Sequence, residues 1–176
     1  METLQAIPDL ASVNTMDRPQ FVATLGPAFE HSPWVAQGAW SARPFASVAA
    51  LHAAMLAVVT SAPADTQLAF LRAHPELAGK EAQASTLTDE SQLEQASAGL
   101  NALSRDEMAE MQRLNAAYRE RHGFPFIIAA RRHGKAQIFA ELRRRLGEDS
   151  ATERSEALAQ IARISRLRVE ALVAST

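Results

Sequence analysis

The sequence contains no cysteine, which excludes disulfide bonds and thiolate chemistry. It also has little excess charge of either sign, since the formal net charge is -2 and the pI is about 6.2. Nucleic-acid-binding domains usually carry a strong basic excess, so we expect no nucleic-acid partner. We therefore interpret the basic clusters RRHGK and ELRRRL as solvated helix faces or a small anion-binding patch.

Long apolar runs are missing as well. The richest apolar stretch, AALHAAMLAVV, is too short to cross a bilayer and contains a histidine. The first residues, METLQAIPDLAS, lack the basic region and long apolar run of a secretory signal. The last residues, VAST, differ from a peroxisomal SKL-type tripeptide. We expect a soluble, cytoplasmic protein with no membrane partner.

Motifs of metal and phosphate sites do not occur. The sequence has no H-E-x-x-H pattern, and HPE is not a ligand spacing with known mechanics. AGK lacks the upstream glycine and the downstream hydroxyl of a Walker motif. A metal site is therefore not predicted.

What the sequence does contain is helical periodicity along most of its length. Its 47% hydrophobic content suits one domain with a real core. The apolar spacing predicts helices that begin near Ser47, Asp65, Thr88 or Asp89, Ser104 and Thr152. A further helix is marked by Ile138, Phe139, Leu142 and Leu146 and closed by Gly147. No run of alternating strands and no repeat of fixed length is apparent. We predict an all-α, single-domain multi-helix bundle over residues 1–176.

Local signals predict where several of these helices start and stop. Pro63 ends the helix that begins near Ser47, and Asp65 can cap the next helix. Ser104 and Glu107 match the capping box S-x-x-E, and Gly123 suits the C-terminal end of the helix that follows. The next stretch, FPFIIAA, is short and apolar, so periodicity leaves strand, loop and helix equally open.

A histidine directly precedes a proline in HPELAGK, residues 74–80. Proline disfavours helical geometry in the residue before it, so we expect His74 at a helix end, where its side chain can face a cleft. Imidazole titrates near neutral pH and suits proton transfer. Position alone also allows a packing role for His74.

The stretch SQLEQ carries Ser91, Glu94 and Gln95 at spacings of three and four residues, so a helix would present them on one face. A hydroxyl, a carboxylate and an amide together suit a polar, nitrogen-rich small molecule. The alternative is an ordinary solvated helix face.

The stretch GFPFII has two phenylalanines on either side of a proline. One interpretation is core packing. The other is an aromatic wall whose irregular backbone offers N–H and C=O groups to a ligand, because the proline interrupts regular pairing. Spacing does not separate the two.

The chain resembles the 2-oxo-4-hydroxy-4-carboxy-5-ureidoimidazoline (OHCU) decarboxylases of the route from urate to allantoin, through FEHSPW, ARPF, RAHPELAGK, LTDESQLEQASAGLNAL, LNAAYRERHGFPFIIAAR and EALAQIARISRLRVEAL. These pieces span most of the chain in the family's order, and HPELAG, ESxxEQxxAGL and GFPFI together are specific. Two departures are small: His122 stands where the family often has an aromatic residue, and Glu76 where aspartate is common.

The resemblance implies an all-helical homodimer that needs no cofactor and forms (S)-allantoin and carbon dioxide from a small-molecule substrate. It implies that His74 is the proton donor and that Glu94 assists. It also implies a set of substrate contacts: Pro75, Ser91, Gln95, Phe124, Pro125, Phe126, Ile127 and Ile128.

Two rival functions follow from the residues alone. A non-catalytic helical interaction module would leave residues 74, 94 and 126 unconnected by any pocket. A helical regulator could instead bind nucleic acid through RRHGK and RRR, with strongly salt-dependent affinity.

Overall fold

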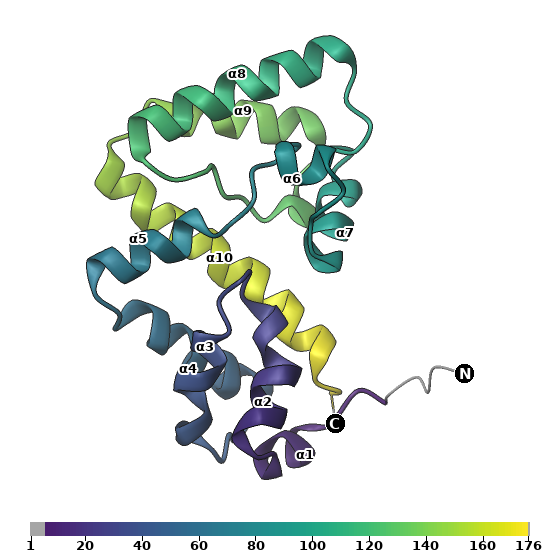
Figure 1. The fold of residues 1–176 in the computed structure, drawn as a ribbon, viewed down its shortest axis with the longest axis vertical. Coiled ribbons are helices and arrows are strands. Elements are labelled where there is room, and N and C mark those ends of the chain that lie inside the picture. Colours follow the sequence, from purple (N-terminus) through teal and green to yellow (C-terminus); the bar gives the residue numbers. More distant parts are fainter. Residues whose placement is uncertain (1–5, 176) are drawn as a thin grey trace. The chain divides into compact units, whose positions relative to one another are not determined.

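The computed structural model describes residues 6–175, and the regular structure in that range is helical (Figure 1). The α-helices are α1 (Leu10–Thr15), α2 (Arg18–Leu25), α3 (Trp34–Ala39), α4 (Val48–Thr60), α5 (Ala64–Arg72), α6 (Lys80–Gln83), α7 (Asp89–Ser97), α8 (Arg105–His122), α9 (Lys135–Leu146) and α10 (Ser150–Leu172). Three short 3-10 helices are η1 (Gly26–Ala28), η2 (Trp40–Ala42) and η3 (Ala130–Arg132). The only strand-like pairing among the described residues is an isolated bridge between Asp9 and Ala174. The predicted all-α fold class is confirmed.

The chain divides into two compact units. The first comprises Met1–Gln67 and Ser165–Thr176, and the second comprises Leu68–Ile164. The divisions fall inside α5 and α10. Each unit is described separately below, and the single domain over residues 1–176 stays a prediction.

Helices of the first unit begin at capping side chains. The side chains of Asp9, Asp17 and Ser47 accept hydrogen bonds from backbone N–H groups in the first turns of α1, α2 and α4. Such caps satisfy donors that have no partner inside the helix. The predicted start of α4 after Ser47 is therefore confirmed.

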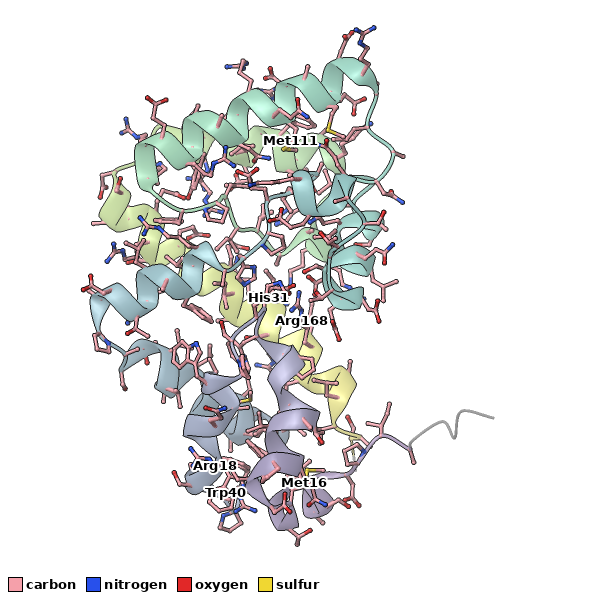
Figure 2. The ribbon with its side chains drawn as sticks, in the orientation of Figure 1. Met16, Arg18, His31, Trp40, Met111 and Arg168 are labelled. Atoms are coloured by element: carbon pink, nitrogen blue, oxygen red, sulfur yellow. The ribbon has the colours of Figure 1, made fainter. Side chains whose placement is uncertain are left out.

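Helix α3 packs closely on α4 and also contacts α2. A Cβ atom at Gly38 would lie 2.8 Å from a methyl group of Val58, so this approach requires glycine. Directly after α3, the Trp40 indole donates to the carbonyl of Met16, and the Arg43 guanidinium lies 4.2 Å from the Trp40 ring centre (Trp40 and Met16 in Figure 2). The buried core of the same unit includes Phe21, Leu25, Leu51 and Met55.

The second unit is built on α8 and α9, which pack side by side (Figure 1). Ser104 Oγ accepts from the N–H of Glu107 at 3.2 Å, and Gly123 ends α8 with φ of 82°. Both helix ends were predicted, and both are confirmed. Met111, Leu114 and Tyr118 form the buried apolar stripe of α8.

Two predicted helix starts need correction. Helix α5 begins at Ala64, so Asp65 lies in the first turn rather than at the cap, because the carbonyl of Pro63 already accepts from the N–H of Gln67 at 2.9 Å. Helix α10 begins at Ser150, two residues before Thr152, because the Asp149 carboxylate accepts from the N–H of Thr152. The hydroxyl of Thr152, and then its N–H, lower the pKa of Asp149 by donating to this carboxylate.

The interpretation of ELRRRL as a solvated face is wrong for one of its arginines. Arg143 and Arg144 are exposed, whereas Arg145 is 0% exposed. Consecutive helical residues point about 100° apart, so three in a row cannot all face solvent on a helix with one buried side. Arg145 is the one that faces the core.

No single helix among residues 6–175 is both long and apolar enough to cross a membrane. Helices α4 and α5 satisfy the length and composition together, across a bend of 113°.

A histidine is buried in the first unit. His52 is 8% exposed, and its Nε2 shares a hydrogen bond of 2.9 Å with Ser165 Oγ. Burial lowers the pKa of His52 below 6.5, and the Arg166 charge lowers it further, while Glu170 opposes this. The folded protein therefore holds His52 neutral at pH values where the unfolded chain protonates it.

We predict that His52 makes the protein less stable in mild acid. The unfolded state binds more protons than the folded state once the pH falls below about 6.5, so the free energy of unfolding decreases with falling pH. His52→Gln keeps a hydrogen-bonding group for Ser165 but does not titrate. Urea unfolding should be measured from pH about 7 to about 5. The free energy of unfolding should fall less steeply with pH for the variant than for wild type, by up to about 1.4 kcal/mol per pH unit. Equal slopes would contradict the assignment.

Candidate functional site

His74 lies at a helix end, as predicted. Helix α5 ends at Arg72, and the N–H of His74 still donates to the carbonyl of Leu71 at 3.3 Å. The imidazole is half-buried and meets the Phe70 ring edge-on, with centroids 6.5 Å apart. The helix stop thus places a partly accessible imidazole at the start of the loop of residues 74–79, the HPE loop.

Helix α7 is attached to the HPE loop by Gln95. Its Oε1 accepts from the N–H of Ala78 at 2.9 Å, and its Nε2 donates to the carbonyl of Glu76 at 3.3 Å. Ser91 and Gln95 are 4% and 5% exposed, and Glu94 between them is half-buried. The predicted polar face of SQLEQ therefore points inward, and the interpretation as a solvated helix face does not hold for Ser91 and Gln95.

The backbone of the HPE loop is held in an unfavourable conformation by side chains from other helices. Ala78 has φ of 49°, a left-handed conformation that is costly for a residue with a Cβ atom. Gln95 holds the Ala78 N–H, and Asn115 Nδ2 donates to the adjacent carbonyl of Leu77 at 3.0 Å. The shape of the loop after His74 is thus set by α7 and α8.

The FPFII segment, residues 124–128, is neither helix nor strand, which answers the question that periodicity left open. All five residues are buried. Tyr118 packs edge-on against Phe124 and Phe126, with ring centroids 5.9 Å and 5.5 Å apart. Just before the segment, Arg72 Nε donates to the carbonyl of Gly123 at 2.8 Å. Core packing of GFPFII is therefore confirmed, with an irregular backbone, and the contact of that backbone with a ligand stays a prediction.

His122 fills the position where an aromatic residue is common in the family. It is buried, its ring centroid is 4.6 Å from that of Tyr118, and its Nδ1 shares a hydrogen bond of 2.9 Å with Ser150 Oγ. It packs as an aromatic residue would and holds the start of α10.

A cavity of about 500 Å³ in the second unit joins part of the predicted site. It brings His74 together with Phe124 and Pro125, whereas Glu94 and Phe126 are not in its lining. The complete lining is Arg72, His74, Glu76, Lys80, Glu81, Arg119, Gly123, Phe124 and Pro125. A cavity that combines an imidazole with several charges suits an anionic, polar ligand.

Sequence reasoning missed the cations of this cavity. Arg119 pairs with the Glu76 carboxylate, and Arg72 reaches the cavity from the last turn of α5. Arg72 stands two residues before His74, and Arg119 stands four residues before Gly123, one turn from the end of α8. Helical spacing from the two predicted helix ends was the signal that could have identified both.

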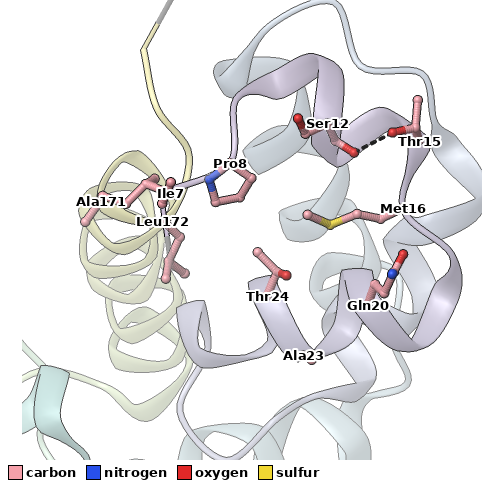
Figure 3. Close-up of a pocket in the computed structure, with 11 residues that line it drawn as sticks. Ile7, Pro8, Ser12, Thr15, Met16, Gln20, Ala23, Thr24, Ala171 and Leu172 are labelled. Carbon is pink, nitrogen blue, oxygen red and sulfur yellow. Dashed lines mark hydrogen bonds between the residues drawn. The ribbon is translucent and has the colours of Figure 1, made fainter. Parts of the chain in front are cut away.

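A second cavity, of about 660 Å³, lies in the first unit (Figure 3). Its lining combines apolar side chains such as Met16 and Leu172 with the neutral polar side chains of Ser12, Gln20 and Thr24. None of its described lining residues carries an ionisable side chain. It therefore offers no acid or base for catalysis, and the His74 cavity is the better candidate.

Within residues 6–175, no three His, Asp or Glu side chains converge in a geometry that could hold a metal ion. The ionisable groups that line the His74 cavity are its imidazole, two carboxylates and three cations.

Comparison with known proteins places these observations in a family. A family model described as OHCU decarboxylase matches residues 14–170. A 2-oxo-4-hydroxy-4-carboxy-5-ureidoimidazoline decarboxylase of Mus musculus is 42% identical over 165 residues, which cover 94% of this chain and 93% of the relative. A protein of the same name from Haloferax volcanii is 44% identical, covering 91% of this chain and 93% of the relative.

A solved structure agrees with the sequence relatives. The crystal structure of an (S)-allantoin synthase superposes with a TM-score of 0.76 at 26% identity, covering 96% of this chain and 54% of that one. The family model spans most of both compact units and includes every predicted site residue. The chain therefore belongs to the OHCU decarboxylase family, and it is a decarboxylase, an enzyme rather than a helical binding module.

Proposed function

We propose that this decarboxylase converts 2-oxo-4-hydroxy-4-carboxy-5-ureidoimidazoline to (S)-allantoin and carbon dioxide in urate degradation, without a cofactor. The observation that carries the proposal is the cavity that joins His74 to Phe124 and Pro125 amid cationic side chains, in a chain whose relatives are named for this substrate. Homodimer formation and a cytoplasmic location stay predictions.

The substrate can accept the electrons of its own decarboxylation. When the bond to the carboxylate breaks, its electron pair moves toward the ring C=N, which acts as an internal sink. The nitrogen of that C=N takes up a proton, the ring hydroxyl loses its proton to become a carbonyl, and the carbon that bears the ureido arm gains a proton. One proton is thus taken up for each carbon dioxide lost. An internal sink makes the electron-accepting role of a bound cofactor unnecessary.

The protein then has to orient the substrate, stabilise developing charge and deliver one proton to one face. In this proposal His74 donates that proton, and Glu94 orients the substrate hydroxyl or assists in removing its proton. Arg72, Lys80 and Arg119 line the same cavity as His74 and would attract the anionic substrate.

Gln95 has a narrower role than the sequence suggests. Both ends of its amide are engaged with the HPE loop, at the N–H of Ala78 and the carbonyl of Glu76. We infer that Gln95 serves the substrate chiefly by fixing the loop that begins at His74 and Pro75. Ser91 is buried on the same face of α7, and we retain it, with the FPFII segment, as a proposed substrate contact.

The first prediction from this proposal concerns the reaction and its proton donor. The unstable substrate is generated in situ from urate, and circular dichroism follows the allantoin formed. We expect the protein to produce rapidly the circular dichroism signal of one enantiomer of allantoin. His74→Asn should lower turnover by about 10²–10⁴-fold, because general acid catalysis is removed. A signal no faster or more chiral than the protein-free reaction would refute the function. Normal turnover in His74→Asn would refute the role of His74 alone.

A second prediction concerns Glu94. Glu94→Gln keeps the size of the side chain but removes the charge, so turnover should fall by about 10²–10⁴-fold while the fold is retained. Glu90→Gln is the matched control, since Glu90 is a half-buried carboxylate one turn earlier on α7. Equal activity of the two variants would remove Glu94 from the mechanism.

A third prediction separates loop fixation from chemistry. Gln95→Ala leaves the buried N–H of Ala78 without its partner, which costs about 1–3 kcal/mol of stability. KM should rise more than kcat falls, because the chemical groups are intact but the loop is less well placed. Gln92→Ala, at an exposed site on α7, should behave as the unmodified protein. A loss confined to kcat would contradict this role for Gln95.

A further inference from the structure

The FPFII segment depends on side chains to hold its backbone. Arg72 holds the carbonyl of Gly123, Arg145 Nη1 donates to the carbonyl of Ile127 at 2.8 Å, and Gln160 Oε1 accepts from the N–H of Ala129 at 3.0 Å. A buried backbone without regular structure needs such partners, since unpaired polar groups are costly there. Only one of the three bonds falls within the segment, and Arg145 makes it.

Arg145 is held rigidly in turn. Its Nε lies 3.1 Å and 3.0 Å from the two carboxylate oxygens of Glu153, and its Nη2 lies 3.0 Å from the same group. Glu153 also accepts from the hydroxyl of Tyr118. Burial first, and then the bond to Glu153, raise the pKa of Tyr118, so its hydroxyl stays a donor. We call Arg145, Glu153 and Tyr118 the Arg145 cluster.

The guanidinium acts on two consecutive residues of the segment. Its central carbon lies 4.5 Å from the centre of the Phe126 ring, while Nη1 binds the carbonyl of Ile127. The planar group therefore fixes a ring and a peptide group relative to each other, which a flexible ammonium could not do. Tyr118 supports the same place by packing on Phe124 and Phe126.

Stability alone does not account for this arrangement. A buried ion pair can often be replaced by apolar residues of similar volume without loss of stability, because both charges must be removed from water to form it. The side chains of Arg145 and Glu153 are 0% and 1% exposed, so they carry the full cost of that removal. The contacts to Phe126 and Ile127 are what an apolar replacement would not supply.

We propose that Arg145 is a positioning residue, which acts through Phe126 and Ile127 to set the geometry of the FPFII segment, whose first two residues line the His74 cavity. Glu153 and Tyr118 keep its guanidinium in one orientation. The inference rests on the proposed function for its effect on catalysis, but the effect on the segment itself is independent of that function.

The test replaces the whole cluster, because Arg145→Met alone would leave the buried carboxylate of Glu153 uncompensated. The triple variant Tyr118→Phe, Arg145→Met and Glu153→Met removes all three polar groups at similar volume. Arg144→Met is the matched control, since it removes the neighbouring arginine of α9, which is exposed and pairs with Glu141 and Glu148. Arg145→Lys keeps the charge and tests whether the planar fork is required.

Two readouts distinguish positioning from general support. With the substrate generated from urate, the triple variant should show KM raised by about 10- to 100-fold and a smaller change in kcat. The allantoin that it forms should have a lower enantiomeric excess. Hydrogen exchange should accelerate in a peptide covering residues 123–130 while α8 keeps its protection. For Arg145→Lys, KM and the exchange rate at residues 123–130 should lie between those of the triple variant and wild type. For Arg144→Met, both should match wild type.

The outcomes separate this inference from the proposed function. Wild-type KM and unchanged exchange at residues 123–130 in a folded triple variant would overturn the positioning role. Uniform loss of protection across the second unit would also overturn it, in favour of a purely structural role. If wild type shows no decarboxylation but the segment still loosens selectively, the proposed function fails and the positioning of the segment stands.

Discussion

Buried backbone that is neither helix nor strand must find its hydrogen-bond partners among side chains, and the second unit depends on this constraint. Two of its irregular stretches, the HPE loop and the FPFII segment, satisfy it in the same way. Gln95 and Asn115 hold the HPE loop at Ala78 and Leu77, and Arg145 holds the FPFII segment at Ile127. These stretches carry His74 and Pro75 and the proposed substrate contacts of the FPFII segment, whereas Glu94 lies on α7. Regular helices thus serve as rigid supports from which long polar side chains reach into the irregular parts.

This construction suits a reaction in which the protein contributes orientation and one proton transfer. An imidazole at the end of a helix gains access to a ligand, but the loop that follows it has to be fixed from outside, and α7 and α8 provide that fixation. The charges around the cavity are also paired in part, since Arg119 binds Glu76. A partly neutralised set of cations can attract an anion without binding it so strongly that release becomes slow.

Sequence patterns predicted the helical parts well because helix ends are local. Ser47, Ser104 and Gly123 act through contacts within one turn, so a short window contains the relevant information. The errors at Asp65 and Thr152 are also local, since Pro63 and Asp149 supply the first bonds instead. The site was harder to predict. That Gln95 and Arg145 turn inward depends on partners 17 and 18 residues away, and periodicity contains no information about such partners.

The Arg145 cluster also restricts how the sequence can change over time. Losing Arg145 or Glu153 alone leaves the charge of the other in the core without its partner, whereas losing both charges together leaves only the carbonyl of Ile127 and the hydroxyl of Tyr118 without theirs. The effect of each substitution therefore depends strongly on the state of the other two positions. A lineage that drifts one substitution at a time would have to pass through unstable intermediates, so the cluster should be inherited or lost as a unit.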